Sequence, residues 1–101
     1  MWTALNMLNA IHGIELVIEG CAPGADRLAE VWASEAGIPV SHHPADWARF
    51  GKSAGARQNE AMLLTRPDLV VAFYADKTAP SPGTRHMVTI ARSADIQVVT
   101  P

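Results

Sequence analysis

The sequence predicts a three-layer α/β domain whose mostly parallel sheet has four strands. Short apolar runs rich in β-branched residues alternate with segments in which apolar residues recur at helical spacing. Strands that alternate with helices are joined by right-handed crossovers, so the strands run parallel and helices cover both faces of the sheet. A chain of 101 residues is long enough for one core, and we expect one domain over residues 1–101.

The first half of the chain is expected to contain two helices and two strands. Trp2, Leu5 and Leu8, followed by Ile11 or His12, form one helical stripe, and the next residue, Gly13, ends that helix. The apolar run over 14–19 predicts a strand. Residues 25–36 predict a helix that is closed by a glycine with a proline just beyond it, and residues 38–42 predict a second short strand.

The second half begins with a polar, turn-rich connector over residues 44–55. This connector is longer than the usual strand–helix loop, and long loops of this kind often carry function. A helix over 56–65, a buried strand over 69–73, a second loop over 75–83, a helix over 84–94 and a strand over 96–99 are expected to follow.

The chain starts in a helix, whereas a doubly wound domain normally starts with a strand that is often central. We therefore expect an N-terminally truncated fold. A missing central strand exposes backbone groups and apolar surface, which favours self-association. Together with the apolar opening helix, this predicts a homodimer.

Composition excludes several classes of function. The net charge is −2 and lysines and arginines are not clustered, so extended nucleic acid is not expected as a partner. No apolar run is long enough to span a bilayer, and no secretory signal is visible. The single cysteine, Cys21, favours a reducing, cytoplasmic location. His42 and His43 are adjacent and would point to opposite faces of a strand, so they could not easily share a metal, and no metal site is expected. No cofactor is expected.

The segment Gly20 to Asp26, Gly-Cys-Ala-Pro-Gly-Ala-Asp, lies between a predicted strand and a predicted helix. Its glycines allow close approach of a ligand, and the first N–H groups of the helix attract an anion. Asp26 could instead cap the helix or contact a sugar hydroxyl, and its charge would repel phosphate. A glycine turn of this kind is also common where no ligand binds.

Ligands of parallel sheets bind beyond the carboxyl ends of the strands, and this rule brings residues 20–26, 44–59 and 73–84 to one edge. Arg57 could pair with phosphate or lie solvated on a helix. Asn59 could read a base or support a loop. Asp46 could contact a ribose, act as a base or cap a turn. Trp47 could stack on a base or cover the core.

Four ordered motifs together resemble the YspA/YpsA-related branch of the SLOG superfamily, which has a Rossmann-like fold. They are Gly20-Cys21-Ala22-Pro23-Gly24-Ala25-Asp26; Pro44-Ala45-Asp46-Trp47; Gly51-Lys52-Ser53-Ala54-Gly55 with Arg57, Asn59 and Met62; and Gly83-Thr84 with Met87. The resemblance extends from about Trp2 to Val99. Family members usually begin with a strand that ends in a Gly-x-Arg type turn, which is absent here.

The resemblance implies a pocket for a nucleotide or a nucleotide-derived small molecule. Backbone groups of the first loop and a second phosphate turn would contact the ligand. Cys21 occupies the phosphate-loop position and is not expected to be a nucleophile. The expected ligand-binding residues are Gly20, Cys21, Gly24, Ala25, Asp26, Asp46, Trp47, Arg57, Asn59, Gly83 and Thr84.

Binding without turnover is the preferred functional hypothesis. The related lonely-guy phosphoribohydrolases use a glutamate in a Gly-Gly-x-Gly-Thr-x-x-Glu motif, and the matching position here is Met87, which can act neither as an acid nor as a base. Two alternatives remain open. One is a nucleotide-processing hydrolase that uses Asp46 or, less favourably, Glu60. The other is a compact protein-interaction inhibitor of a host system.

Overall fold

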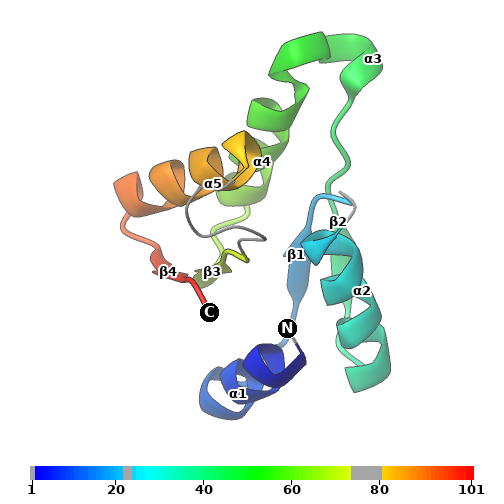
Figure 1. Ribbon diagram of the computed structural model, residues 1–101, viewed down its shortest axis with the longest axis vertical. Helices are drawn as coiled ribbons and strands as arrows, with labels where there is room; N and C mark the ends of the chain where they lie inside the picture. Colours follow the sequence, from blue (N-terminus) through cyan, green and yellow to red (C-terminus); the bar gives the residue numbers. More distant parts are fainter. Residues whose placement is uncertain (1, 22–23, 74–80) are drawn as a thin grey trace. The chain divides into compact units, whose positions relative to one another are not determined.

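The computed structural model describes residues 2–21, 24–73 and 81–101 of the chain. The chain divides into two compact units, Met1–Pro44 and Ala45–Pro101 (Figure 1). Each unit contains helices and one pair of parallel strands.

The first unit consists of α1 (Trp2–His12), β1 (Val17–Glu19), α2 (Ala25–Ala36) and β2 (Val40–His42). Strands β1 and β2 are parallel, and α2 forms the connection between them. Their register pairs Val17 with Val40, Ile18 with Ser41, and Glu19 with His42. The last residues of the two strands therefore lie side by side at one edge of the sheet.

Helix α2 ends where the sequence predicts, at a glycine. Gly37 has φ 71°, in the left-handed region, and its N–H donates to the carbonyl of Ser34. The N–H of Ile38 donates to the carbonyl of Ala33 at 2.9 Å. These two bonds form a Schellman motif, in which glycine is preferred because it has no Cβ.

The core of the first unit is built from the helical stripes. Leu5 and Leu8 are buried on α1, and Trp32 and Ala33 are buried on α2. The indole Nε1 of Trp32 donates to Asn6 Oδ1 at 2.9 Å, so this bond connects the two helices.

The second unit consists of α3 (Trp47–Phe50), a 3₁₀ turn η1 (Gly51–Ser53), α4 (Ala54–Leu64), β3 (Leu69–Val71), α5 (Pro82–Ser93) and β4 (Gln97–Val99). Strands β3 and β4 are parallel, with Val70 paired to Val98. Helices α4 and α5 pack side by side (Figure 1). Ala54, Asn59, Val88 and Ala91 are buried on its helices, and Ala72 is buried directly after β3.

The connector over 44–55 was predicted as a loop, and this expectation is wrong for most of its length. Residues 47–53 form α3 and η1, and α4 begins at Ala54 rather than at residue 56. The physical reason is local capping. The side chain of Asp46 accepts the N–H of Arg49 at 3.0 Å, which satisfies one of the unpaired donors at a helix start.

The mixed α/β class and the parallel direction of the strands are confirmed. All four predicted strands are present in shorter form. A single four-stranded sheet is not confirmed, because the described strands pair as β1–β2 and β3–β4 in two separate sheets. Residues 75–80 of the predicted loop over 75–83 lie outside the described residues. The predicted end of this loop is wrong, because α5 begins at Pro82 rather than at residue 84. No helix within the described ranges is long and apolar enough to cross a bilayer.

Candidate functional site

The first predicted loop is organised by the carboxylate of Asp26. Its Oδ2 accepts the backbone N–H of Gly20 at 3.1 Å, so this bond connects the residue after β1 with the first turn of α2. Gly24 precedes α2 with φ 90° and ψ −123°, a conformation that favours glycine, and Ala25 is the first helical residue. The start of α2 therefore already holds one negative charge, which opposes a phosphate at the same position.

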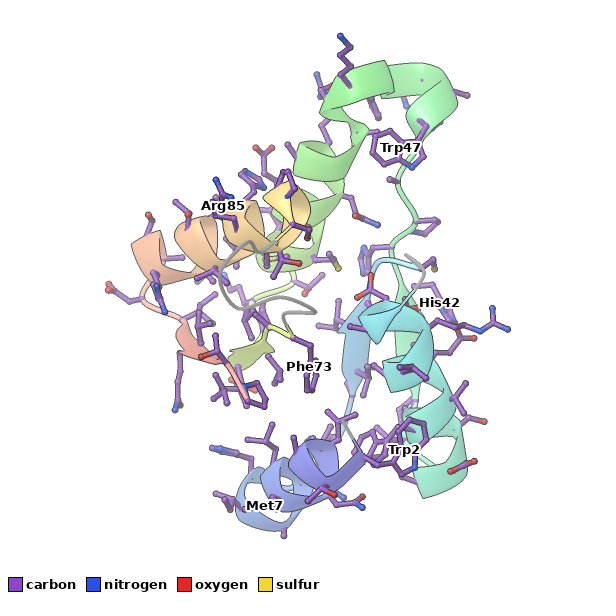
Figure 2. All side chains as sticks on the ribbon, viewed as in Figure 1. Trp2, Met7, His42, Trp47, Phe73 and Arg85 are labelled. Carbon is purple, nitrogen blue, oxygen red and sulfur yellow. The ribbon has the colours of Figure 1, made fainter. Side chains whose placement is uncertain are left out.

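A second cluster lies at the carboxyl ends of β1 and β2, and it consists of Glu19, Cys21 and His42. Glu19 is the last residue of β1 and is almost fully buried, whereas the other two are exposed. Its Oε1 is hydrogen-bonded to His42 Nδ1, and its Oε2 accepts the backbone N–H of Cys21. The thiol Sγ lies 3.5 Å from Glu19 Oε1 and 3.6 Å from His42 Nδ1 (Figure 2 labels His42).

Cys21 has φ 61°, which is unusual for a residue other than glycine. The bond from the N–H of Cys21 to Glu19 Oε2 helps to offset the cost of this conformation. Desolvation, and then the hydrogen bond and negative charge of Glu19, raise the pKa of the Cys21 thiol above its ordinary value. A raised pKa disfavours the thiolate, which is the nucleophilic form of a cysteine.

For Asp46 and Trp47 in the second unit, the sequence left several roles open, and the structure shows their surroundings. Asp46 caps α3 through the Arg49 N–H, so the capping interpretation is confirmed. Trp47 does not cover a core, because 63% of its surface is exposed (Figure 2). One edge of its ring lies close to Gly55, where an added Cβ would be 3.6 Å from Cη2.

Arg57 lies exposed on the first turn of α4, and two neighbours hold its guanidinium. The Nε donates to Ser53 Oγ at 3.2 Å, and Cζ lies 4.3 Å from the centroid of the Phe50 ring. Arg49 lies over the same ring at 4.9 Å. An aromatic face attracts a cation, so the ring restrains both guanidinium groups.

Asn59 supports the start of α5, so the loop-support interpretation is confirmed. It is 6% exposed, and its Nδ2 donates to the Gly83 carbonyl at 2.9 Å and lies 3.1 Å from His86 Nδ1. At the same helix start, Ser81 Oγ accepts the N–H of Thr84 at 3.3 Å and donates to its hydroxyl at 2.8 Å. Ser81 therefore already occupies a donor that the sequence assigned to phosphate.

The predicted site residues thus fall into two groups. Gly20, Cys21, Gly24, Ala25 and Asp26 belong to the first unit, and Asp46, Trp47, Arg57, Asn59, Gly83 and Thr84 belong to the second.

The sequence analysis missed four residues that shape these groups. They are Glu19, His42, Phe50 and Ser81. The signal for the first two was their position at the ends of neighbouring parallel strands, where side chains from distant parts of the chain meet.

A hollow in the second unit is lined by residues from the end of α4 and the approaches to β3 and β4, including Leu63, Arg66, Asp68 and Ile96. It lies at the amino ends of these strands. Ligands of parallel sheets bind at the opposite, carboxyl ends. The hollow's lining includes Glu60, the less favoured carboxylate of the hydrolase alternative, but none of the expected ligand-binding residues.

Parallel strands joined through helices, with a glycine turn between β1 and α2, define a class of α/β proteins that includes nucleotide-binding folds. Residues 1–50 match the family described as the YspA, cpYpsA-related SLOG family. The chain is 35% identical over 106 aligned positions to the Gene 61 protein of Mycobacterium phage D29. The alignment covers 98% of this chain and 82% of the phage protein. No solved structure matches. The chain belongs to the YspA, cpYpsA-related SLOG family.

Proposed function

We propose that this protein binds a phosphate-bearing nucleotide or nucleotide-derived small molecule and does not turn it over. Membership of the SLOG family supports a nucleotide-related function. The observation that carries the proposal further is the restrained guanidinium of Arg57 in the second unit.

The restraint at Arg57 matters because binding otherwise costs the entropy of a long side chain. Stacking on Phe50 and the bond from Nε to Ser53 fix the plane of the guanidinium. The donors on the two terminal nitrogens form the fork that pairs with two phosphate oxygens. An arginine held in this way loses less freedom when an anion binds.

The two helix starts contribute less than the sequence alone indicates. Asp26 places a carboxylate at the start of α2, and Ser81 accepts the N–H of Thr84 at the start of α5. A phosphate at the start of α2 would be repelled by the negative charge of Asp26, whereas a sugar hydroxyl could donate a hydrogen bond to the same carboxylate. We therefore assign the phosphate contact to Arg57.

Calorimetry with mononucleotides, dinucleotides, cyclic nucleotides and the matching nucleosides tests this assignment. Removal of a charged hydrogen-bond partner costs about 1.5–3 kcal/mol, so Arg57→Ala should weaken phosphate-bearing ligands by roughly ten- to a hundredfold. The affinity for nucleosides should be unchanged, because they lack the group that Arg57 contacts.

Two arginines provide matched controls. Arg49→Ala also removes a cation from the Phe50 ring, and Arg92→Ala removes an exposed charge from the last turn of α5. Both variants should keep the wild-type affinity within about twofold, since surface electrostatics alone contributes little at physiological salt. If no nucleotide binds, or if all three variants bind equally, the proposed phosphate contact is wrong.

Absence of turnover is part of the proposal. Asp46, the preferred carboxylate of the hydrolase alternative, accepts the Arg49 N–H as a cap, and Glu60, the less favoured one, is exposed on α4. Met87 occupies the position of the catalytic glutamate of the resembling hydrolases. Chromatography of the nucleotides after prolonged incubation with the protein should return them unchanged, and accumulation of a base or of free phosphate would favour the hydrolase.

Self-association stays a prediction. Met7 and Ile11 are 60% and 71% exposed on α1, which is consistent with an apolar surface that a second copy could cover. Light scattering at micromolar concentration should give the mass of a dimer, and a stable monomer would remove the argument.

A further inference from the structure

Glu19, Cys21 and His42 form a group that the nucleotide proposal does not use. One donor atom from each residue, Oε1, Sγ and Nδ1, lies within 4.8 Å of the other two. Two facts distinguish this group from a chance surface contact. Glu19 is buried, so its carboxylate needs a partner. Glu19 and His42 are the paired last residues of β1 and β2, and Cys21 follows β1 by two residues.

The arrangement does not suit a nucleophilic relay. In such a relay the imidazole contacts the nucleophile through one ring nitrogen and the orienting carboxylate through the other. Here both Cys21 Sγ and Glu19 Oε1 approach the same atom, His42 Nδ1. Three donor atoms within 4.8 Å of one another, rather than in series, can instead share one metal ion.

The distances support the same conclusion. With bonds of about 2.3 Å to sulfur and about 2.0–2.2 Å to nitrogen and oxygen, a tetrahedral zinc site has S···N and S···O separations of about 3.5–3.6 Å. The corresponding separations are 3.6 Å from Sγ to Nδ1 and 3.5 Å from Sγ to Oε1. The third edge, between Oε1 and Nδ1, is a hydrogen bond and is shorter than a tetrahedral edge. It has to lengthen when a metal takes the place of the proton.

We propose that Glu19, Cys21 and His42 bind a single Zn²⁺ ion or a divalent transition-metal ion of similar softness, with solvent in the fourth position. A thiolate and an imidazole select against Mg²⁺ and Ca²⁺, which prefer oxygen ligands. Because Cys21 and His42 are exposed while Glu19 is buried, the ion has an open path to the site and a fixed ligand on its inner side.

Metal binding at this site displaces protons. The Cys21 thiol loses its proton to solvent and becomes a thiolate. The proton between Glu19 and His42 is displaced, so that Nδ1 can donate its lone pair to the ion. The imidazole then carries its proton on Nε2. The Cys21 N–H, which already donates to Glu19 Oε2, keeps the carboxylate oriented.

Titration of the full chain with Co²⁺ under a phosphine reductant tests the proposal. We expect a thiolate-to-cobalt absorption band that saturates at one equivalent and is abolished by one equivalent of Zn²⁺. Cys21→Ser should remove the band. His42→Asn and Glu19→Gln should each weaken Co²⁺ at least tenfold, since loss of even an outer-shell partner costs 10–100-fold.

His43→Asn is the matched control. His43 is the next residue along the chain, and its Nε2 pairs with Ser41 Oγ at 3.1 Å. This variant should bind Co²⁺ like the wild type. Circular dichroism verifies that each variant is folded. If His42→Asn does not fold, Cys21→Ser provides the test. Equal binding by the wild type and Cys21→Ser, equal loss in His42→Asn and His43→Asn, or equal binding by urea-unfolded protein overturns the proposal.

Discussion

Asn59 offers the sharpest test of how the second unit is held together. It lies in the middle of α4, and its buried side chain reaches the start of α5 through the Gly83 carbonyl and His86 Nδ1. In Asn59→Ala both bonds are lost. Each contributes about 0.5–1.5 kcal/mol net, and an acceptor that is left unpaired adds to the loss. Gly83 is exposed, so water can partly replace the lost donor.

We expect Asn59→Ala to lower the free energy of unfolding by about 2 kcal/mol and Tm by about 10 °C for a chain of this length. Asn59→Asp keeps the size of the side chain but cannot donate to the carbonyl, so its loss should be at least as large. Urea unfolding followed by circular dichroism measures both. Amide hydrogen exchange should accelerate at the start of α5.

Glu60→Ala is the control for the Asn59 variants, because Glu60 is exposed on the same helix. It should change stability by less than about 0.5 kcal/mol. A double-mutant cycle of Asn59→Ala with His86→Ala then isolates the bond between the two side chains. The reasoning is refuted if Asn59→Ala and Asn59→Asp are both as stable as Glu60→Ala.

Three further substitutions test individual contacts by urea unfolding. Trp32→Phe should cost about 1 kcal/mol through loss of the bond to Asn6, and an additive double variant with Asn6→Ala would contradict this. Gly37→Ala should cost about 1–2 kcal/mol of stability, because the φ of Gly37 is 71°. An added Cβ would meet no atom, so this cost comes from the backbone conformation alone, and a neutral result would show that the C-cap relaxes. Ser81→Ala should cost about 1 kcal/mol of stability, because the cap to the Thr84 N–H is lost. Ser81→Asp should restore the cap and the stability, and an aspartate variant as unstable as the alanine variant would argue against capping.

Much of the local structure could be predicted from the sequence. Hydrophobic periodicity located all four strands and the four longer helices, because burial of one face imposes a repeat that differs between helices and strands. Gly37 ends α2 as expected, since only glycine adopts that turn without cost. The connector helix was not predicted, because capping was only one of several roles considered for Asp46, the residue that caps this helix.

The site depended on contacts that no local pattern specifies. Glu19 and His42 are 23 residues apart and meet only because the register of β1 and β2 pairs them. The left-handed backbone of Cys21 then brings the thiol to the same point, although sequence spacing argued against a metal. Asn59 likewise supports Gly83 only through the packing of α4 on α5. Sequence determined which segments are helices and strands, because their periodicity is local. Strand register and helix packing decided which polar side chains converge, because these contacts join residues that are distant in the chain.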